Sequence, residues 1–203
     1  MLTIYLVRHG ETLFNVREVV QGWVDSPLTE RGWEQVRTVA TRLALRPIAG
    51  VYTSTSERAR DTAEAIAAVH PGVSVVADRG FKELHFGDFE ARPNDAVLAA
   101  MQPVDQFFSG MIGGSHPGLP GGESGAAFRT RVQAAMARVV ADHPAGGEVV
   151  VVSHGVTINT LLVLAGWHSP GPLKNASISV LRHSGNALPE CIAVGLDDVD
   201  ALF

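Results

Sequence analysis

Residues 148–153 (EVVVVS) contain four consecutive valines, a continuous β-branched run. The run has no polar alternation, which is typical of a strand buried on both faces, as in the centre of a parallel sheet. A sheet of that kind needs helices on both sides to cover it. We therefore expect further strands that alternate with amphipathic helices along the chain.

The rest of the sequence supplies that alternation. Thr29 is a good N-cap, with Glu30 in the first turn after it, and Trp33, Val36, Ala40 and Leu43 then recur at helical spacing, which predicts a core-facing stripe. Apolar runs predict strands at 2–7, 50–54, 73–77, 178–183 and 190–195. Helical patterns cover 29–46, 56–70 and 155–166, and Ser124 is expected to cap a further long helix. These segments predict an α/β fold, a three-layer sandwich with a mostly parallel central sheet, in a single domain over residues 1–203.

The segment between the third strand and the Ser124-capped helix is harder to interpret. Residues 94–109 are expected to be helical in part, with a break near Pro103. Residues 110–125 (GMIGGSHPGLPGGESG) are rich in glycine and proline and predict a long loop. Loops of this length in compact domains are usually functional or disordered, and the sequence leaves the roles of this loop and of His116 open.

Composition excludes several functional classes. The formal net charge of −5 and the absence of a basic block argue against a nucleic-acid partner. The apolar runs are too short to span a bilayer, and we expect neither a signal peptide nor membrane association. Cys191 is the only cysteine, so no internal disulfide can form. Together these features favour a cytoplasmic location.

Two of the predicted strands end in a histidine followed by a glycine. Residues 2–7 lead into Arg8-His9-Gly10, and residues 148–153 lead into His154-Gly155. Ligands of open α/β sheets bind at the carboxyl ends of the strands, and glycine leaves room there for a ligand or a sharp turn. A neutral imidazole is a competent nucleophile near pH 7, and an arginine fork matches phosphate oxygens. The pair Arg8-His9 therefore predicts a phosphoryl site with a phosphohistidine intermediate.

Phosphoryl transfer needs further positive charge and a proton for the leaving alcohol. Arg58 lies in the first turn of a predicted helix, from where its side chain can reach back over the strand ends. Three carboxylates, Glu83, Asp88 and Glu90, follow the third strand in a loop-like segment and are candidates for the general acid. The residues alone do not choose among the three.

Five blocks of the chain resemble, in order, the histidine phosphatase superfamily in its phosphoglycerate-mutase-like branch. These blocks are LVRHGET with the following QGWVDSPLTERG, SERARDTAE, KELHFGDFE, PGGES and VVSHG. The resemblance extends over nearly the whole chain. The chain departs from the family pattern at Ser54-Thr55-Ser56, where Ser-Pro-Leu is common, and at Glu90-Ala91, where Glu-Gly is common.

The resemblance implies a role for each matching residue. His9 would become phosphorylated, Glu83 would be the proton donor, and Arg8, Arg58 and His154 would hold the phosphoryl oxygens. Substrate-binding or supporting positions would be Asn15, Gln21, Gly22, Thr12 and Gly155. The family needs no metal, and no cofactor is expected. The partner would be a small phosphorylated metabolite, and the family suggests a homodimer.

The sequence therefore favours a phosphatase that hydrolyses small phosphomonoesters. A phosphoglycerate mutase uses the same machinery, but the chain lacks room for the longer insertions of the true mutases. A metal-dependent hydrolase is disfavoured because no H-E-x-x-H or C-x-x-C spacing occurs. A non-catalytic phospho-ligand binding module would be expected to have lost the nucleophile or the acid, and both are present. The sequence does not identify the physiological substrate.

Overall fold

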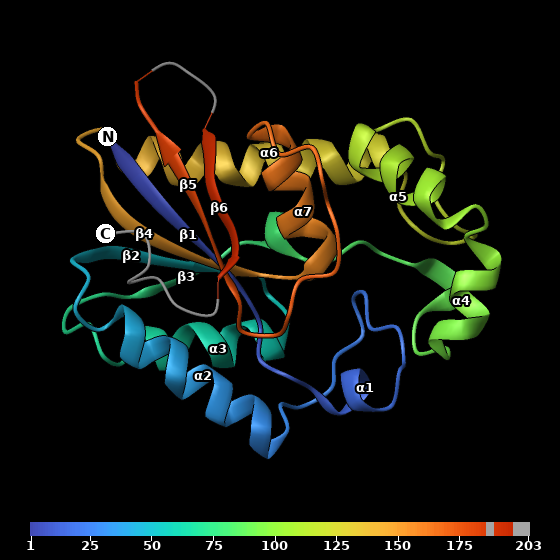
Figure 1. The fold of residues 1–203 in the computed structure, drawn as a ribbon, viewed down its shortest axis with the longest axis horizontal. Coiled ribbons are helices and arrows are strands. Elements are labelled where there is room, and N and C mark those ends of the chain that lie inside the picture. Colours follow the sequence, from blue (N-terminus) through green and yellow to red (C-terminus); the bar gives the residue numbers. More distant parts are fainter. Residues whose placement is uncertain (186–188, 197–203) are drawn as a thin grey trace.

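The computed structural model describes residues 1–185 and 189–196, and its centre is a six-stranded sheet in the order β3-β2-β4-β1-β5-β6 (Figure 1). Neighbouring strands among β1, β2, β3 and β4 pair in parallel, whereas β5 runs antiparallel to both of its neighbours. The strands are β1 (Leu2–Arg8), β2 (Ile48–Thr53), β3 (Val75–Ala77), β4 (Gly147–Ser153), β5 (Ile178–His183) and β6 (Glu190–Leu196). The predicted mostly parallel sheet is confirmed.

Helices cover both faces of this sheet (Figure 1). On one face lie α2 (Glu30–Leu43) and α3 (Glu57–Ala67), and on the other lie α6 (Gly125–Asp142) and α7 (Gly155–Leu164). Buried side chains form one core cluster on each side of the sheet. The predicted three-layer α/β sandwich is therefore confirmed. None of the helices in the described part of the chain is both long and apolar enough to cross a membrane.

Helix α2 shows how local sequence sets an element. The Thr29 hydroxyl accepts the Gly32 N–H at 2.9 Å and so satisfies one of the free donors of the first turn. The helix then buries Val36, Val39, Ala40 and Leu43 against the sheet. Trp33, which we expected to face the core, is 37% exposed, because the buried stripe begins at Gly32 and Val36.

The segment between β3 and α6 folds into a helical cap on one side of the molecule (Figure 1). It contains the short 3-10 turns η1 (Arg79–Phe81) and η2 (Gly87–Phe89), followed by α4 (Asn94–Ala100) and α5 (Val104–Gly113). The break predicted at Pro103 falls between α4 and α5. The predicted loop over 110–125 is wrong for its first four residues, because burial of Met111 and Ile112 in the core outweighs the helix penalty of the glycines.

The remaining helix, α1 (Leu13–Val16), is a single turn in the loop after β1. Thr12 caps it, and Asn15 completes a capping box with Thr12. This loop and the cap are joined by backbone hydrogen bonds, from the Val20 N–H to Arg92 and from the Ala91 N–H to Val20, each at 2.9 Å. The loop after β1 and the start of the cap are therefore joined side by side.

Candidate active site

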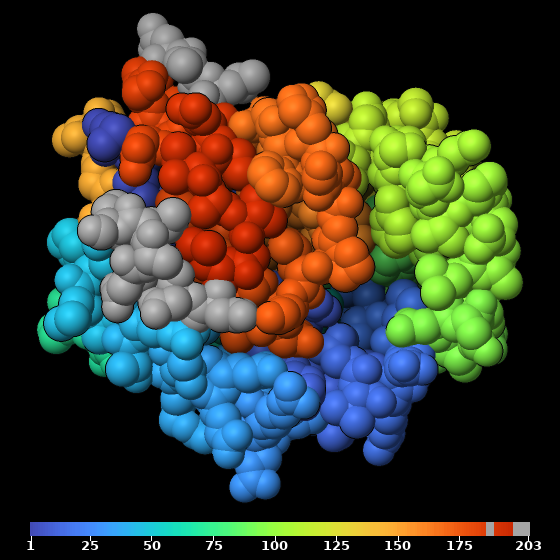
Figure 2. All heavy atoms as spheres, in the orientation of Figure 1, coloured from blue at the N-terminus to red at the C-terminus, as the bar shows by residue number. Residues whose placement is uncertain are grey.

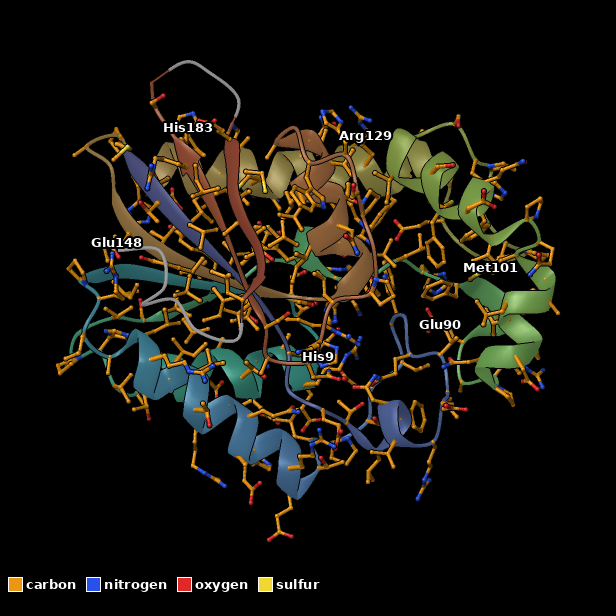
Figure 3. The ribbon with its side chains drawn as sticks, in the orientation of Figure 1. His9, Glu90, Met101, Arg129, Glu148 and His183 are labelled. Atoms are coloured by element: carbon orange, nitrogen blue, oxygen red, sulfur yellow. The ribbon has the colours of Figure 1, made fainter. Side chains whose placement is uncertain are left out.

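The sheet register brings the two strand-terminal histidines together. Arg8 pairs with Ser153 across β1 and β4, and the His9 N–H donates to the Ser153 carbonyl at 3.1 Å. The next residues along the two strands are then neighbours, and the ring centroids of His9 and His154 lie 5.2 Å apart. Figure 3 places His9 in the middle of the molecule, just after the carboxyl end of β1. The structure therefore brings the two His-Gly steps together at the carboxyl ends of β1 and β4.

The hydrogen bonds of His9 define which nitrogen can react. Nδ1 lies 2.8 Å from the Gly10 carbonyl, which can only accept, so Nδ1 carries the proton. Nε2 therefore carries the lone pair of the ring, which accepts a long hydrogen bond from Arg58 Nε at 3.4 Å. Burial first, and then the Arg58 and Arg8 charges, hold the pKa of His9 well below its ordinary value. His9 is thus a neutral base with Nε2 facing a cation.

Arg58 is the centre of the site. It is 1% exposed and bridges the two rings, because its Nη2 donates to His154 Nδ1 at 3.1 Å while Nε faces His9. Asp25 pairs with its Nη1 at 2.6 Å, and the Val24 and Gly22 carbonyls accept further bonds at 3.1 and 2.9 Å. The loop residues Gly22, Val24 and Asp25 therefore fix the guanidinium on the side away from the two rings. Arg58 reaches over the strand ends, as predicted.

His154 is held in a defined tautomer as well. Since Nδ1 accepts from Arg58, the ring proton lies on Nε2, which donates to Ser54 Oγ at 2.8 Å. Burial lowers the pKa of His154 well below its ordinary value, and the neighbouring Arg58, His9 and Arg8 add to that effect. Ser54 directly follows β2 and matches the serine of the family's Ser-Pro-Leu pattern, whereas Thr55 and Ser56 depart from it. Ser54 thus orients His154 directly.

Arg8 and the backbone of His9 are secured by the segment before β5. The Arg8 guanidinium donates to the Leu173 carbonyl, and Asn175 Nδ2 donates to the His9 carbonyl and to Asn15 Oδ1, each at 3.1 Å. Burial lowers the pKa of Arg8. Its Nε is buried without a partner among the described residues, which leaves one donor beside His9 for a ligand. No sequence signal pointed to Asn175.

The two glycines after the histidines have different roles. A Cβ on Gly10 would lie 2.8 Å from the Gly32 carbonyl and from a Val36 methyl group, so this glycine permits close packing of α2. The need for glycine at position 10 thus comes from packing against α2, and the predicted space for a ligand does not explain it. At Gly155 a Cβ would meet only Glu83 Oε2 at 3.8 Å, an ordinary contact. Gly155 starts α7 directly below the Glu83 carboxylate.

The loop after β1 supplies the remaining predicted binding positions. Thr12 is fully buried, and its hydroxyl donates to Asn15 Oδ1 at 3.1 Å and accepts the Asn15 N–H at 3.2 Å. It therefore supports Asn15 and has no surface for a ligand. Gln21 is buried, and its Oε1 accepts from Ser26 at 3.3 Å. Asn15 and Gln21 come from the same loop as Gly22, whose carbonyl binds Arg58.

Glu90 holds the part of that loop that binds Arg58. Its two oxygens accept the backbone N–H groups of Trp23 at 2.8 Å and Val24 at 2.9 Å. A Cβ on Gly22, which has φ +54°, would collide with Glu90 Oε1 at 2.4 Å, so glycine is required there. Glu90 thus positions Arg58 through the loop. Ala91 has φ +58°, a left-handed conformation in which the glycine of the family pattern is less strained.

Of the three candidate acids, Glu83 is the one that contacts residues directly after the His154-Gly155 step. Its carboxylate sits at the N-terminus of α7, where it accepts the N–H groups of Val156 at 2.9 Å and Thr157 at 3.1 Å. The Thr157 hydroxyl and the Leu84 N–H donate to the same carboxylate at 3.1 and 2.9 Å. Glu83 is buried, whereas Asp88 is exposed on η2 and Glu90 is occupied by the loop.

An ion pair that sequence reasoning missed secures the backbone around Glu83. Arg131 on α6 donates to the carbonyls of Gly80 at 3.0 Å, Lys82 at 2.7 Å and Glu83 at 2.7 Å. The same guanidinium pairs with Glu123 at 2.5 and 2.9 Å. Glu123 belongs to the block PGGES, which the sequence analysis identified. Its partner Arg131 lies on α6, in a segment that matches no motif. We refer to this pair as the Arg131–Glu123 clamp.

The sequence leaves the roles of His85 and His116 open, and in the structure each ring packs against another aromatic side chain. His85 packs against Trp23 with ring centroids 4.7 Å apart, and Trp23 Nε1 donates to the Glu83 carbonyl at 2.9 Å. His116 packs against Phe107 on α5, with centroids 4.7 Å apart, and its Nδ1 accepts the Gly118 N–H. His116 is thus part of the cap's own packing.

The geometry supports anion chemistry more directly than metal chemistry. The two imidazoles are bridged by a guanidinium, and a lone pair, a fixed cation and a carboxylate converge at the carboxyl ends of β1, β2 and β4. Over residues 1–185 and 189–196, no three His, Cys, Asp or Glu side chains gather in a group suited to a metal ion. A phosphoryl group offers both the electrophile and the negative charge that this arrangement matches.

Solved structures with this architecture place the chain in the phosphoglycerate-mutase-like class of α/β proteins. Bacillus stearothermophilus YhfR superimposes with a TM-score of 0.81 at 30% identity over 98% of both chains. A mycobacterial glucosyl-3-phosphoglycerate phosphatase, Rv2419c, solved with VO3, has a TM-score of 0.81 at 26% identity and covers 98% of this chain and 100% of its own. The chain belongs to the histidine phosphatase superfamily (branch 1), whose family model matches residues 4–192.

Curated relatives carry a mutase name. A protein of Yersinia enterocolitica described as "Probable phosphoglycerate mutase GpmB" is 38% identical over 163 residues, which is 80% of this chain and 74% of the relative. The neighbours therefore include both phosphatases and mutases. The resemblance noted in the sequence is confirmed at the level of the superfamily.

Proposed function

We propose that this protein is a phosphatase that hydrolyses small phosphomonoesters through a phosphohistidine on His9. The observation that carries the proposal is the lone pair on the buried His9 Nε2, which faces the Arg58 guanidinium. A nucleophile with a defined tautomer beside fixed positive charge fits attack on a phosphoryl group. The partner is then a small phosphorylated metabolite, and no metal or cofactor takes part in the steps below.

In the first step, His9 Nε2 attacks phosphorus and the bond from phosphorus to the ester oxygen breaks. The phosphoryl oxygens are gripped by Arg8, Arg58 and His154, with Asn15 and Gln21 beside them. Glu83 transfers a proton to the departing alkoxide, so the alcohol leaves neutral. The buried Nε of Arg8, which has no partner among the described residues, supplies one of the donors that the phosphoryl group requires.

In the second step, water attacks the phosphohistidine and the bond from Nε2 to phosphorus breaks. The ionised Glu83 takes a proton from the attacking water, so the acid of the first step acts as the base of the second. Inorganic phosphate leaves, the lone pair returns to Nε2, and Glu83 is protonated again. The carboxylate needs a fixed position for both transfers, and its four hydrogen bonds fit that need.

The experiment is to trap the phosphoenzyme with a labelled ester and to measure its stability in acid and base. Phosphohistidine is labile in acid and stable in base, so we expect label that survives alkali and is lost in acid. His9→Ala should abolish both labelling and turnover. His183→Ala is the matched control, because His183 lies at the far end of β5 (Figure 3), and it should label normally. Appreciable turnover by His9→Ala would refute the nucleophile.

A second candidate, phosphoglycerate mutase, is favoured by the 38% identity to the protein described as GpmB. A mutase returns the phosphoryl group to the substrate and does not release it to water. Phosphate release and interconversion of 2- and 3-phosphoglycerate should therefore be measured in the same reaction. Interconversion faster than release would favour the mutase, and release without interconversion would favour the phosphatase.

A further inference from the structure

A polar groove of about 480 Å³ lies between α2 and the chain that leads into β5. Figure 2 shows α2, in light blue, against the orange and red end of that chain on one face of the molecule. None of the proposed catalytic residues lines this groove, so it is separate from the candidate active site. The polar and charged side chains that a ligand would meet include Glu11, Arg31, Gln35, Arg42, Lys174 and Asn175.

Positive charge exceeds negative charge in the groove. Three cations, Arg31, Arg42 and Lys174, line it together with a single carboxylate, that of Glu11. Glu11 pairs with Arg31 at 3.7 Å, and the Arg31 side chain is largely exposed, so this pair is weak. Because the whole chain has a formal charge of −5, its average composition does not explain a cationic groove. The local charge attracts anions to this face of the molecule.

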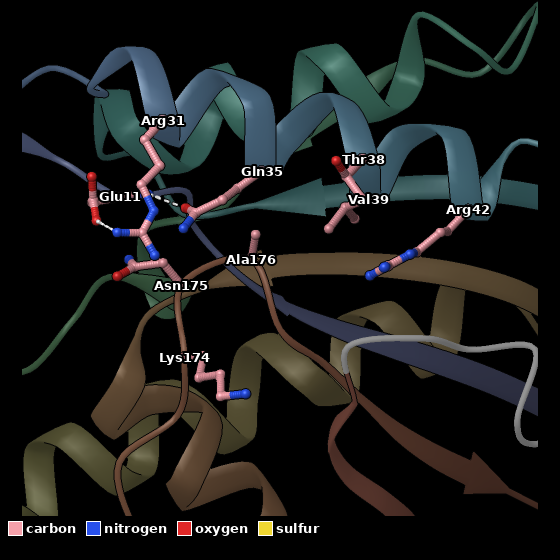
Figure 4. Close-up of a pocket in the computed structure, with 9 residues that line it drawn as sticks. All are labelled: Glu11, Arg31, Gln35, Thr38, Val39, Arg42, Lys174, Asn175 and Ala176. Atoms are coloured by element: carbon pink, nitrogen blue, oxygen red, sulfur yellow. Dashed lines mark hydrogen bonds and ion pairs between the residues drawn. The ribbon is translucent and has the colours of Figure 1, made fainter.

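Arg42 is the cation in this groove that is best placed for a ligand. It is half-buried, yet it forms no hydrogen bond or ion pair with any residue in 1–185 and 189–196. Figure 4 shows its guanidinium extending from α2 on the side of residues 174–176. Gln35, on the same wall, accepts the Glu11 N–H through Oε1 at 2.9 Å, and its amide nitrogen has no partner within the same ranges. A charged donor and a neutral donor therefore remain for an anion.

Both walls of the groove also hold the backbone around His9. Asn175 Nδ2 donates to the His9 carbonyl at 3.1 Å, and the Ala176 N–H donates to the carbonyls of Arg8 and His9 at 3.0 and 3.2 Å. On the α2 side, Gln35 binds the N–H of Glu11, which follows His9 by two residues. A ligand that contacts both walls therefore acts on the position of His9 without touching its ring.

We propose that the groove is a second anion site, which binds a small metabolite that carries at least two phosphate or carboxylate charges. The anion pairs with Arg42 and joins α2 to residues 174–176. The volume of the groove falls within the range of about 300–1,000 Å³ that is typical of small-molecule sites. The bound anion steadies the backbone of His9 and raises kcat, and this second statement rests on the function proposed above.

The first experiment measures binding by calorimetry with two probes, citrate and methylenebisphosphonate. The two probes distinguish carboxylate from phosphate chemistry, and ionic strength is held constant because salt screens exposed charges. We expect Arg42→Gln to weaken binding of at least one probe by about tenfold. Arg37→Gln removes the same charge from the same helix and is the matched control, because Arg37 is exposed and does not line the groove.

Three results would overturn the second site. The first is the absence of binding of both probes. The second is equal weakening by Arg42→Gln and Arg37→Gln, because net charge alone would then account for binding. The third is loss of binding in Arg58→Ala without any effect of Arg42→Gln, which would place the probe in the active site. Binding that persists in Arg58→Ala and weakens in Arg42→Gln would support the groove.

The second experiment measures the link to His9. We expect the saturating probe to raise kcat for 4-nitrophenyl phosphate at least about twofold in the unmodified enzyme and in Arg37→Gln. At the same probe concentration, Arg42→Gln should show no such rise. An unchanged or lower kcat with the probe bound would overturn the link. If no ester is hydrolysed at all, the proposed function fails, whereas calorimetry still decides whether the groove binds an anion.

Discussion

The two sides of the candidate site are built in different ways. On the proposed phosphoryl-binding side, His9 and His154 follow adjacent strands, and Arg58 bridges them from the start of α3. On the proposed proton-donor side, Glu83 lies in a segment without regular structure, between η1 and η2. Its position depends on the N-terminus of α7 and on the Arg131–Glu123 clamp.

This difference teaches where each function is encoded. The register of β1 and β4 fixes the histidines, so the phosphoryl-binding side is as rigid as the sheet core. Glu83 is instead fixed by backbone N–H groups at the start of α7 and by side chains from α6 and α7. Changes on the first side should therefore affect every substrate equally, whereas changes on the second should affect substrates according to the acidity of the leaving alcohol.

The largest effect is expected for Arg58→Ala. Loss of a preorganised donor to a developing anion typically costs about 10²–10³ in rate, or about 2.7–4 kcal/mol. The loss in kcat/KM should be similar for alkyl and 4-nitrophenyl phosphates, and binding of inorganic vanadate should weaken as well. Arg60→Ala is the matched control, because Arg60 is exposed and pairs only with Glu64 at 3.6 Å. Unequal loss for the two esters would contradict the comparison.

Glu83→Gln should have a smaller and more selective effect. An alkoxide needs a proton to leave, whereas 4-nitrophenolate does not, and general acid catalysis is typically worth about 10²–10⁴. We expect a decrease of about 10² in kcat/KM for an alkyl phosphate and only a few-fold decrease for 4-nitrophenyl phosphate. Steady-state kinetics with both esters measures this. A uniform decrease would mean that another group is the acid.

Arg131→Lys should reproduce the pattern of Glu83→Gln in weaker form. Lysine keeps the charge but cannot donate to three carbonyls and pair with Glu123 at once, so Glu83 would shift slightly. Small misplacements of a catalytic group can cost up to about 10², and we expect about tenfold for alkyl phosphates. Rates with 4-nitrophenyl phosphate should change little.

Arg129→Lys is the control for this experiment. Arg129 lies on the same helix and also donates to backbone carbonyls, those of Ile112 and Gly113, but these belong to the end of α5. Its replacement should leave the ratio between the two esters unchanged. If Arg131→Lys lowers the rates for both esters equally, the clamp stabilises the fold and does not position the acid.

The same contrast explains what the sequence could predict. The fold class, the pairing of His9 with His154 and the reach of Arg58 follow from strand ends, because strand polarity makes nearby positions predictable. Among Glu83, Asp88 and Glu90 the residues alone left the acid open. The deciding contacts are long-range, from α7 and α6, and no local pattern encodes them.

Two further contacts escaped prediction for the same physical reason. Asn175 supports His9 from a position 166 residues away in the chain, and its neighbourhood has no motif. The helix through Gly113 was missed since its stability comes from burial of Met111 and Ile112, which overrides the intrinsic preference of the glycines. Tertiary packing decides such cases, and it is invisible in a single sequence.

The smallest expected effect is a change in the pKa of His9 in the folded Arg58→Ala variant. Burial and the charges of Arg58 and Arg8 lower the pKa of His9, so the neutral nucleophile should persist well below pH 6.5. Removal of one cation in Arg58→Ala takes away part of that lowering, and the pKa of His9 should move upward. NMR titration of the His9 ring in the free enzyme measures this without interference from the ionisation of a substrate. A fall in the pKa of His9, or no change, would mean that the Arg58 charge does not help to keep His9 neutral. The two sides of the site would then differ less in their electrostatics than in their geometry.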